Sequence, residues 1–179
     1  MKPLSTVALM LNLGVASICA QQRPVTGSFS GTAAPSSIIL NKDALGTGEY
    51  NFDGTGSLGP FSFRAFTSSA PAQKPLGSTC AIYGSVVAGA GVVRLQDGSL
   101  LMGNSATGTD CIMFLPTGPV AYCTRTFKIA RGTGRLRNAS GNTITFTFTV
   151  LPILFDTSGA PALSGITDGE LTGKLSVVN

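Results

Sequence analysis

Polar and apolar residues alternate without exception from Thr143 to Val150, with Thr at every odd position and a large apolar residue at every even one. A period of two, built from β-branched and aromatic residues, is typical of a strand with one wet face and one buried face. A helix would spread the same residues around its circumference. We therefore expect a strand whose inward side chains line a core: Ile144, Phe146, Phe148 and Val150.

The preceding segment, Gly132–Asn142, is rich in turn-forming residues. Its three glycines permit positive φ, and its Asn and Ser residues favour turns. Between the turns we expect a short strand with Arg135 and Arg137 on one face and Leu136 on the other.

The rest of the chain consists of about ten short strand-like segments separated by Gly- and Pro-containing turns. Asp97-Gly98 lies between two such segments and is typical of a type I′ hairpin turn. The 23 glycines and the low charged fraction of 11% also favour strands over helices. This pattern is shared by sandwiches and barrels, and we predict an all-β fold, an antiparallel meander closed as a roughly eight-stranded β-barrel.

The first 20 residues have the features of a secretory signal peptide. Lys2 gives a positive start, Val7–Ala20 is an apolar run, and polar residues follow Ala20. We expect cleavage near Ala20, a secreted or periplasmic protein, and a single β-barrel domain over residues 21–179. No later run is long enough for a membrane-spanning helix, and aromatic residues, at 7%, are too few for the two girdles of an outer-membrane barrel.

Composition excludes several classes of chemistry. The chain has no His, which excludes His-based triads and His-ligated metals. No Cys pair has metal-ligand spacing, and the nearest carboxylate pair, Asp168 and Glu170, fits an exposed strand end. We predict no catalytic residue, no metal and no cofactor. Of 12 basic residues, 11 remain without Lys2, against 8 acidic ones. A net charge of +3 does not indicate a nucleic-acid partner.

Three cysteines follow the leader: Cys80, Cys111 and Cys123. Export makes a disulfide plausible. Cys111 and Cys123 are equidistant from Thr117, so a hairpin with an odd-length loop would place them opposite each other. We predict the Cys111–Cys123 disulfide, with a bond from Cys80 to either of them as the alternative.

Five cations fall within 13 residues, the densest charge cluster of the chain: Arg125, Lys128, Arg131, Arg135 and Arg137. One hypothesis is a site for an anion or a glycan at the barrel rim, formed by Arg125, Arg131, Arg135 and Arg137. The alternative is a solubilising face that protects a strand edge. Arg125 differs from the others because it shares its face with Cys123 and Phe127, which suits a barrel-end residue or a ligand contact.

Three motifs carry a family resemblance: GTGRLRNASG at 132–141, GTGSLGPFSF at 54–63 and LQDGSLLMGN at 95–104. They resemble, in the same order, the GGTGRFxGATG-, GxGTHLGxFT- and ANGDxLxG-type segments of small secreted bacterial proteins, which are similar to allene oxide cyclase-like and dirigent-like barrels. This chain lacks the His of the second motif and has Asn138-Ala139-Ser140 in place of Gly-Ala-Thr. The resemblance implies an eight-or-so-stranded barrel and carries over no catalytic residue.

Three functional hypotheses follow. The first is a secreted, non-catalytic domain that binds a small apolar or carbohydrate ligand or a protein partner. The second is a cyclase or isomerase that acts in the barrel cavity, as the resemblance suggests, and the third is a structural protein with a filled barrel. The interior discriminates among them, because eight strands either leave room for one small ligand or are just filled by side chains.

Overall fold

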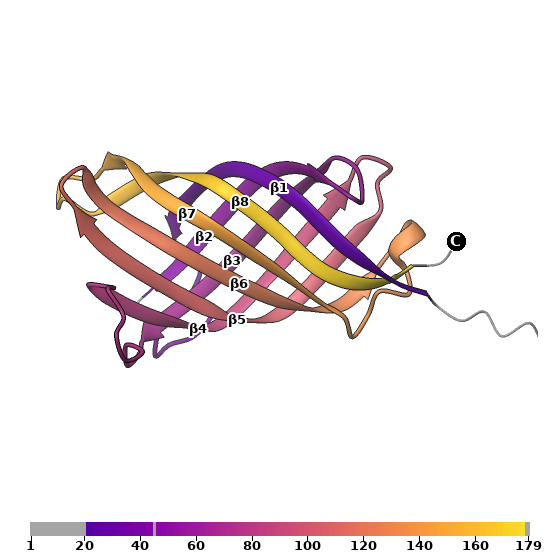
Figure 1. Ribbon diagram of the computed structural model, residues 1–179, viewed down its shortest axis with the longest axis horizontal. Helices are drawn as coiled ribbons and strands as arrows, with labels where there is room; N and C mark the ends of the chain where they lie inside the picture. Colours follow the sequence, from indigo (N-terminus) through magenta and orange to yellow (C-terminus); the bar gives the residue numbers. More distant parts are fainter. Residues whose placement is uncertain (1–20, 45, 178–179) are drawn as a thin grey trace, which may run out of the picture.

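The computed structural model describes residues 21–44 and 46–177, and eight antiparallel strands form a closed barrel in chain order (Figure 1). The ring is closed by pairing of the first strand with the last. The predicted antiparallel meander is thus confirmed. The strands are β1 (Gln21–Ser36), β2 (Gly46–Gly56), β3 (Phe61–Pro71), β4 (Ile82–Leu95), β5 (Leu100–Leu115), β6 (Gly118–Gly132), β7 (Thr143–Phe155) and β8 (Pro161–Val177).

The alternation in β7 places its apolar row inside the barrel. Ile144, Phe146 and Phe148 are buried, and Val150 is half-buried and packs against the edge of the core. The threonines between them face outward. Asp97-Gly98 lies in the β4–β5 turn, as the sequence predicts, but only Gly98 has a positive φ, 82°, so the turn is not of the predicted type I′, which needs positive φ at both residues.

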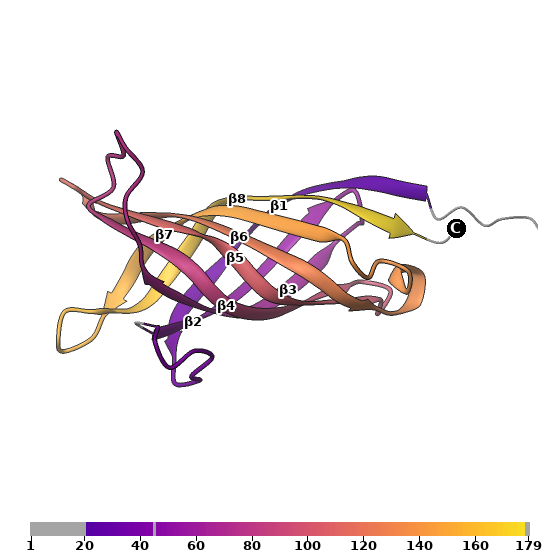
Figure 2. The ribbon, with the colours of Figure 1, turned by 90° about the horizontal axis from the view of Figure 1, so that it is seen from below.

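Because consecutive strands are antiparallel, their connections lie alternately at one end of the barrel and at the other (Figures 1 and 2). The β2–β3, β4–β5 and β6–β7 connections lie at one end, together with residues 21 and 177. We call this the capped end. The other four connections, β1–β2, β3–β4, β5–β6 and β7–β8, lie at the opposite, distal end.

A short 3-10 helix, η1 (Gly134–Leu136), replaces the strand predicted around Arg135 and Arg137. Leu136 is fully buried because the β6–β7 connection folds back under the barrel and closes the capped end. This path needs Gly132, where a Cβ atom would lie 1.8 Å from the Leu136 carbonyl oxygen. The alternation of polar and apolar residues within one segment cannot predict such a tertiary contact. Within the described residues, no helix is long and apolar enough to cross a membrane.

The predicted Cys111–Cys123 disulfide is wrong: Cys80 is bonded to Cys111, and Cys123 is a buried free thiol. The reason is the length of the β5–β6 turn. Leu115 pairs with Gly118, so the loop between them has an even number of residues and Cys111 lies opposite Tyr122. Cys123 pairs with Asp110 and faces the interior, so the two cysteines are on opposite faces of the sheet.

Truncation of Phe146 tests the packing of the interior. We expect Phe146→Ala to lower the free energy of unfolding by about 3–5 kcal/mol, because the surrounding rings cannot collapse into the space. Chemical denaturation followed by circular dichroism measures the change. Thr147→Ala, on the outer face of the same strand, is the matched control and should change stability by less than about 0.5 kcal/mol. Equal effects of the two substitutions would contradict the inward assignment of Phe146.

The disulfide assignment is tested by alkylation of protein that lacks residues 1–20. Burial raises the pKa of the Cys123 thiol far above its ordinary value, so almost no reactive thiolate forms near neutral pH. We expect no modification by iodoacetamide in the native state and one modified cysteine, Cys123, in denaturant without reductant. Peptide mapping that finds the label on Cys80 would instead favour the Cys111–Cys123 pairing.

Candidate functional site

The middle of the barrel is filled by a layer of aromatic rings. The Phe63 and Phe146 rings stack at 4.2 Å between centroids, as do those of Phe29 and Phe52. Phe127 meets Phe146 edge-on at 6.0 Å. These rings come from five strands and meet across the barrel axis. The gap among them next to Tyr50 admits no water-sized molecule, so this layer leaves no room for an internal ligand.

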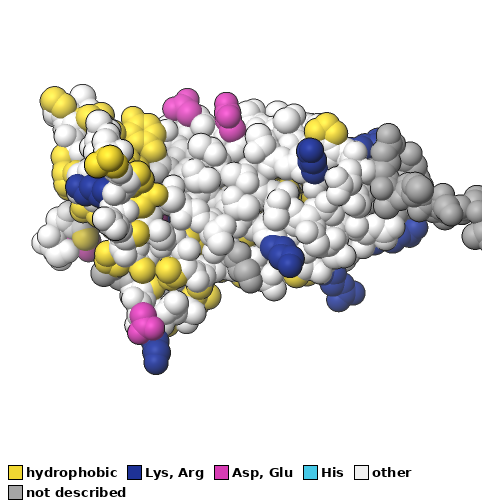
Figure 3. All heavy atoms as spheres, turned by 60° about the horizontal axis from the view of Figure 1, so that its bottom comes forward, with side chains coloured by type: hydrophobic (Ala, Val, Ile, Leu, Met, Phe, Trp, Pro, Cys, Tyr) yellow, Lys and Arg dark blue, Asp and Glu magenta, His cyan; other side chains and the backbone are white. Residues whose placement is uncertain are grey.

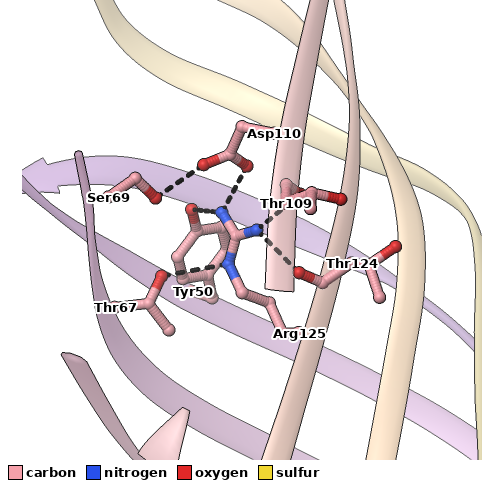
Figure 4. Close-up of polar contacts among 7 residues, drawn as sticks. All are labelled: Tyr50, Thr67, Ser69, Thr109, Asp110, Thr124 and Arg125. Atoms are coloured by element: carbon pink, nitrogen blue, oxygen red, sulfur yellow. Dashed lines mark hydrogen bonds and ion pairs between the residues drawn. The ribbon is translucent and has the colours of Figure 1, made fainter. Parts of the chain in front are cut away.

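Arg125, on β6, lies inside the barrel between this aromatic layer and the distal end, and its side chain is 3% exposed (Figure 4). Its Nε donates to Thr67 Oγ1 at 3.0 Å, and Nη1 donates to the carbonyl oxygens of Thr109 and Thr124. Nη2 donates to Tyr50 Oη at 2.9 Å and to Asp110 Oδ1 at 2.6 Å. A guanidinium has five N–H donors, and here each has an acceptor.

The counter-ion of Arg125 is also fully engaged. The second carboxylate oxygen of Asp110 accepts a hydrogen bond from Ser69 Oγ at 2.6 Å. Burial alone lowers the pKa of Arg125, but attraction to the Asp110 carboxylate outweighs this effect and the pKa is raised, so the guanidinium stays charged. Burial also raises the pKa of Tyr50, which remains a neutral phenol. The cluster is an internal network in which every guanidinium donor is used, so Arg125 has no donor left for a ligand.

The four arginines of the predicted rim site do not meet. Arg125 is enclosed in the distal half of the barrel, whereas Arg131, Arg135 and Arg137 are exposed at the capped end. Arg135 pairs with Asp97, Nε to Oδ2 at 3.0 Å, and also donates to the carbonyl of Leu58. The capped end therefore keeps a basic rim, but Arg125 takes no part in it.

A hollow lies on the outside of the barrel, over the middle of β2, β3 and β4, and we call it the outer groove. This outer groove has a volume of about 770 Å³. Residues that face outward from adjacent strands line it, and register places them side by side: Arg64 opposite Val92, Phe66 opposite Ala90, and Ser62 opposite Arg94. Asn51 and Asp53 of β2 complete one wall.

The groove combines an apolar floor with cationic edges. Phe66, Ala90 and Val92 supply carbon surface, while Arg64 and Arg94 stand at its margins. Arg64 is held by Glu49 at 2.7 Å, a contact that lowers the pKa of that carboxyl. Arg94 belongs to none of the ion pairs found among the described residues. This arrangement can bind an apolar body together with an anionic group.

The outer groove was not predicted from the sequence, although one signal was present. In β3 the outward row Ser62, Arg64, Phe66 places a large aromatic residue on the otherwise polar face, and in β4 the outward Val92 precedes Arg94 by two. An apolar residue on the wet face of each of two adjacent strands indicates a surface site. Strand pairing and register were needed to bring the two rows together.

Within the described residues there is no grouping of three or more Cys, Asp or Glu side chains suited to a metal ion. Comparison of the chain with family models, curated proteins and solved structures gave no match.

The internal network is tested by breaking the Arg125–Asp110 pair from one side. We expect Arg125→Met to lower the free energy of unfolding by about 3–5 kcal/mol, because it leaves the carboxylate of Asp110 without its counter-ion. Addition of Asp110→Asn should cost less than the sum of the two single changes. Denaturant titration of the four proteins gives the coupling. Arg64→Met, at the exposed Glu49 pair, is the control with a much smaller effect, and additivity of the buried pair would contradict the network.

Proposed function

We propose that this protein is an exported, non-catalytic binding domain that holds a small ligand in the outer groove of β2–β4. The observation that carries the proposal is the contrast between a filled interior and a groove of about 770 Å³ on the outer face. A pocket of this size is in the range of small-molecule sites, which are mostly apolar with a few placed polar groups.

The chemistry of the groove narrows the class of ligand to an organic acid with an apolar or aromatic body. Phe66 and Val92 offer the body a flat carbon surface, and an aromatic ring can stack on Phe66. Arg94 offers a forked donor to a carboxylate, sulfate or sulfonate. Asn51 and Ser62 add uncharged hydrogen-bonding groups, which also suits a hydroxylated, glycan-like portion of a ligand.

The filled interior weakens the alternative of a cyclase or isomerase that works inside the barrel. Such catalysis needs an enclosed, water-excluding cavity around the substrate, and stacked rings of Phe63 and Phe146 occupy that position. A purely structural protein with a filled barrel stays as the competing interpretation. It predicts that the outer groove binds nothing.

The test uses anilinonaphthalene sulfonate, an aromatic sulfonate, and the uncharged phenyl-naphthylamine as matched probes. We expect backbone amide shifts in nitrogen-15 NMR to cluster on β2–β4 around Arg64 and Ala90. Arg94→Gln should weaken the sulfonate about fivefold, since an exposed charge contact is worth roughly 1 kcal/mol, and should leave the uncharged probe unchanged.

A groove-filling variant gives the second arm of the test. We expect Ala90→Trp to lower affinity for both probes at least about tenfold by occupying the floor. Thr147→Trp, which places the same ring on the outer face of β7, should leave binding unchanged. No amide shifts on β2–β4, or equal behaviour of the two Trp variants, would exclude this site and favour the structural interpretation.

A further inference from the structure

Large apolar side chains are exposed at the distal end of the barrel, and Figure 3 shows them gathered at its left. Leu76 is fully exposed, Ile39 is 80% exposed and Phe114 is 67% exposed. We call the set on the four distal connections and the strand ends next to them the apolar crown: Ile38, Ile39, Leu76, Ile82, Phe114, Leu115, Ile153, Leu154 and Phe155.

The crown is a property of one end and not of hairpin connections in general. At the capped end the β4–β5 turn is Gln96–Ser99, and the β2–β3 connection contains Ser57 and Gly59. Such residues are normal for turns, because they tolerate turn geometry and interact with water. At the distal end, exposed apolar side chains lie on or directly next to all four connections, which are far apart in sequence. Clustered exposure of this kind marks an interaction surface.

The shape of the crown narrows the choice of partner. Its members stand on the β1–β2 and β3–β4 connections and on the distal ends of strands, and Figure 2 shows those two connections splayed to opposite sides of the barrel. A rigid protein partner would need a separate pocket for each projecting tip. A fluid hydrocarbon phase accommodates all of them at once, whatever their spacing.

A second layer of residues lies just above the crown. Tyr83 and Tyr122 both pair with Cys111, one from each neighbouring strand, so all three face outward. Tyr122 is 47% exposed. Tyrosine is enriched where a protein passes from hydrocarbon to water, because its ring is apolar and its hydroxyl is polar. Farther along, the outer face of β7 carries Thr143, Thr145 and Thr147, so on this strand the apolar surface ends after about one layer.

We propose that the apolar crown inserts into the interfacial region of a lipid bilayer and attaches the barrel to a membrane surface by its distal end. The polar outer face of β7 beyond this layer limits insertion to the distal connections and strand ends, as in proteins that lie on a membrane rather than span it.

Charges near the crown are balanced, so apolar insertion supplies the attachment. Lys42 and Lys74 are exposed on the β1–β2 and β3–β4 connections, and Asp43 is exposed beside Lys42. Asp156, in the β7–β8 turn, accepts hydrogen bonds from Ser158 and Ala160 of its own turn. Binding should therefore occur on zwitterionic phosphatidylcholine, which has no net charge, and gain little from anionic lipid.

The experiment is flotation of the protein with phosphatidylcholine vesicles and with vesicles containing phosphatidylglycerol at one lipid in five. Residues 7–20 are themselves apolar, so every variant is prepared without residues 1–20 and checked by intact mass. We expect the wild-type chain to float with both kinds of vesicle. The triple variant Ile39→Ser, Phe114→Ser, Ile153→Ser should lower the partition coefficient at least about tenfold, since binding scales with inserted apolar area.

Val87→Ser is the matched control, because Val87 is 42% exposed on β4 but lies outside the crown. It should partition like the wild type, and all variants should keep the same circular dichroism spectrum. Absence of wild-type binding, or equal binding by the triple variant, would overturn the proposal. It would also fail if sedimentation showed a wild-type dimer that the triple variant abolishes while neither protein floats, since a second copy would then cover the crown. Probe binding in the outer groove is measured separately and does not depend on this outcome.

Discussion

Closure of the ring determines how the interior of this protein is filled. Eight strands enclose an interior of nearly fixed width that side chains must fill. Here phenylalanines fill it, and glycines on neighbouring strands make room for them: at Gly169 a Cβ atom would lie 2.4 Å from the Phe29 ring, and at Gly54 it would lie 2.5 Å from the Phe61 ring. A barrel filled in this way has used its interior for stability, so binding chemistry has to be sought on the outer surface.

The buried arginine is a consequence of the same closure. A charge inside a barrel is tolerated only when it is paired and all its donors are satisfied. The acceptors of Arg125 come from β2, β3, β5 and β6 itself, and no buried side-chain nitrogen or oxygen of the described residues lacks a partner. A register slip of one residue would turn Thr67 or Asp110 to the opposite face of its strand. We infer that the network favours the observed register over its neighbours.

The features that depend only on residues close together in the sequence could be predicted. Strict alternation in Thr143–Val150 identified the inward row, and turn chemistry identified the antiparallel meander. The sequence could not decide between the predicted Cys111–Cys123 disulfide and the alternative with Cys80, because a loop of odd or even length decides whether Cys111 faces Cys123 or Tyr122, and both lengths fit the sequence around Thr117. Arg125 was correctly placed on an apolar face of its strand. Its partner Asp110 could not be predicted, because only the β5–β6 register brings the two residues together. The outer groove likewise depends on which strands pair.

The outer groove and the apolar crown occupy different parts of the barrel, and this separation bears on how they could work together. The groove lies along the middle of β2–β4, whereas the crown lies at the distal tips. Attachment by the crown would keep the groove above the membrane surface, open to water, with Arg94 toward the capped end. A ligand with an apolar body and an acidic group is amphipathic and partitions between water and lipid. If both proposals hold, the barrel would hold such a molecule beside the surface from which it exchanges, without internalising it.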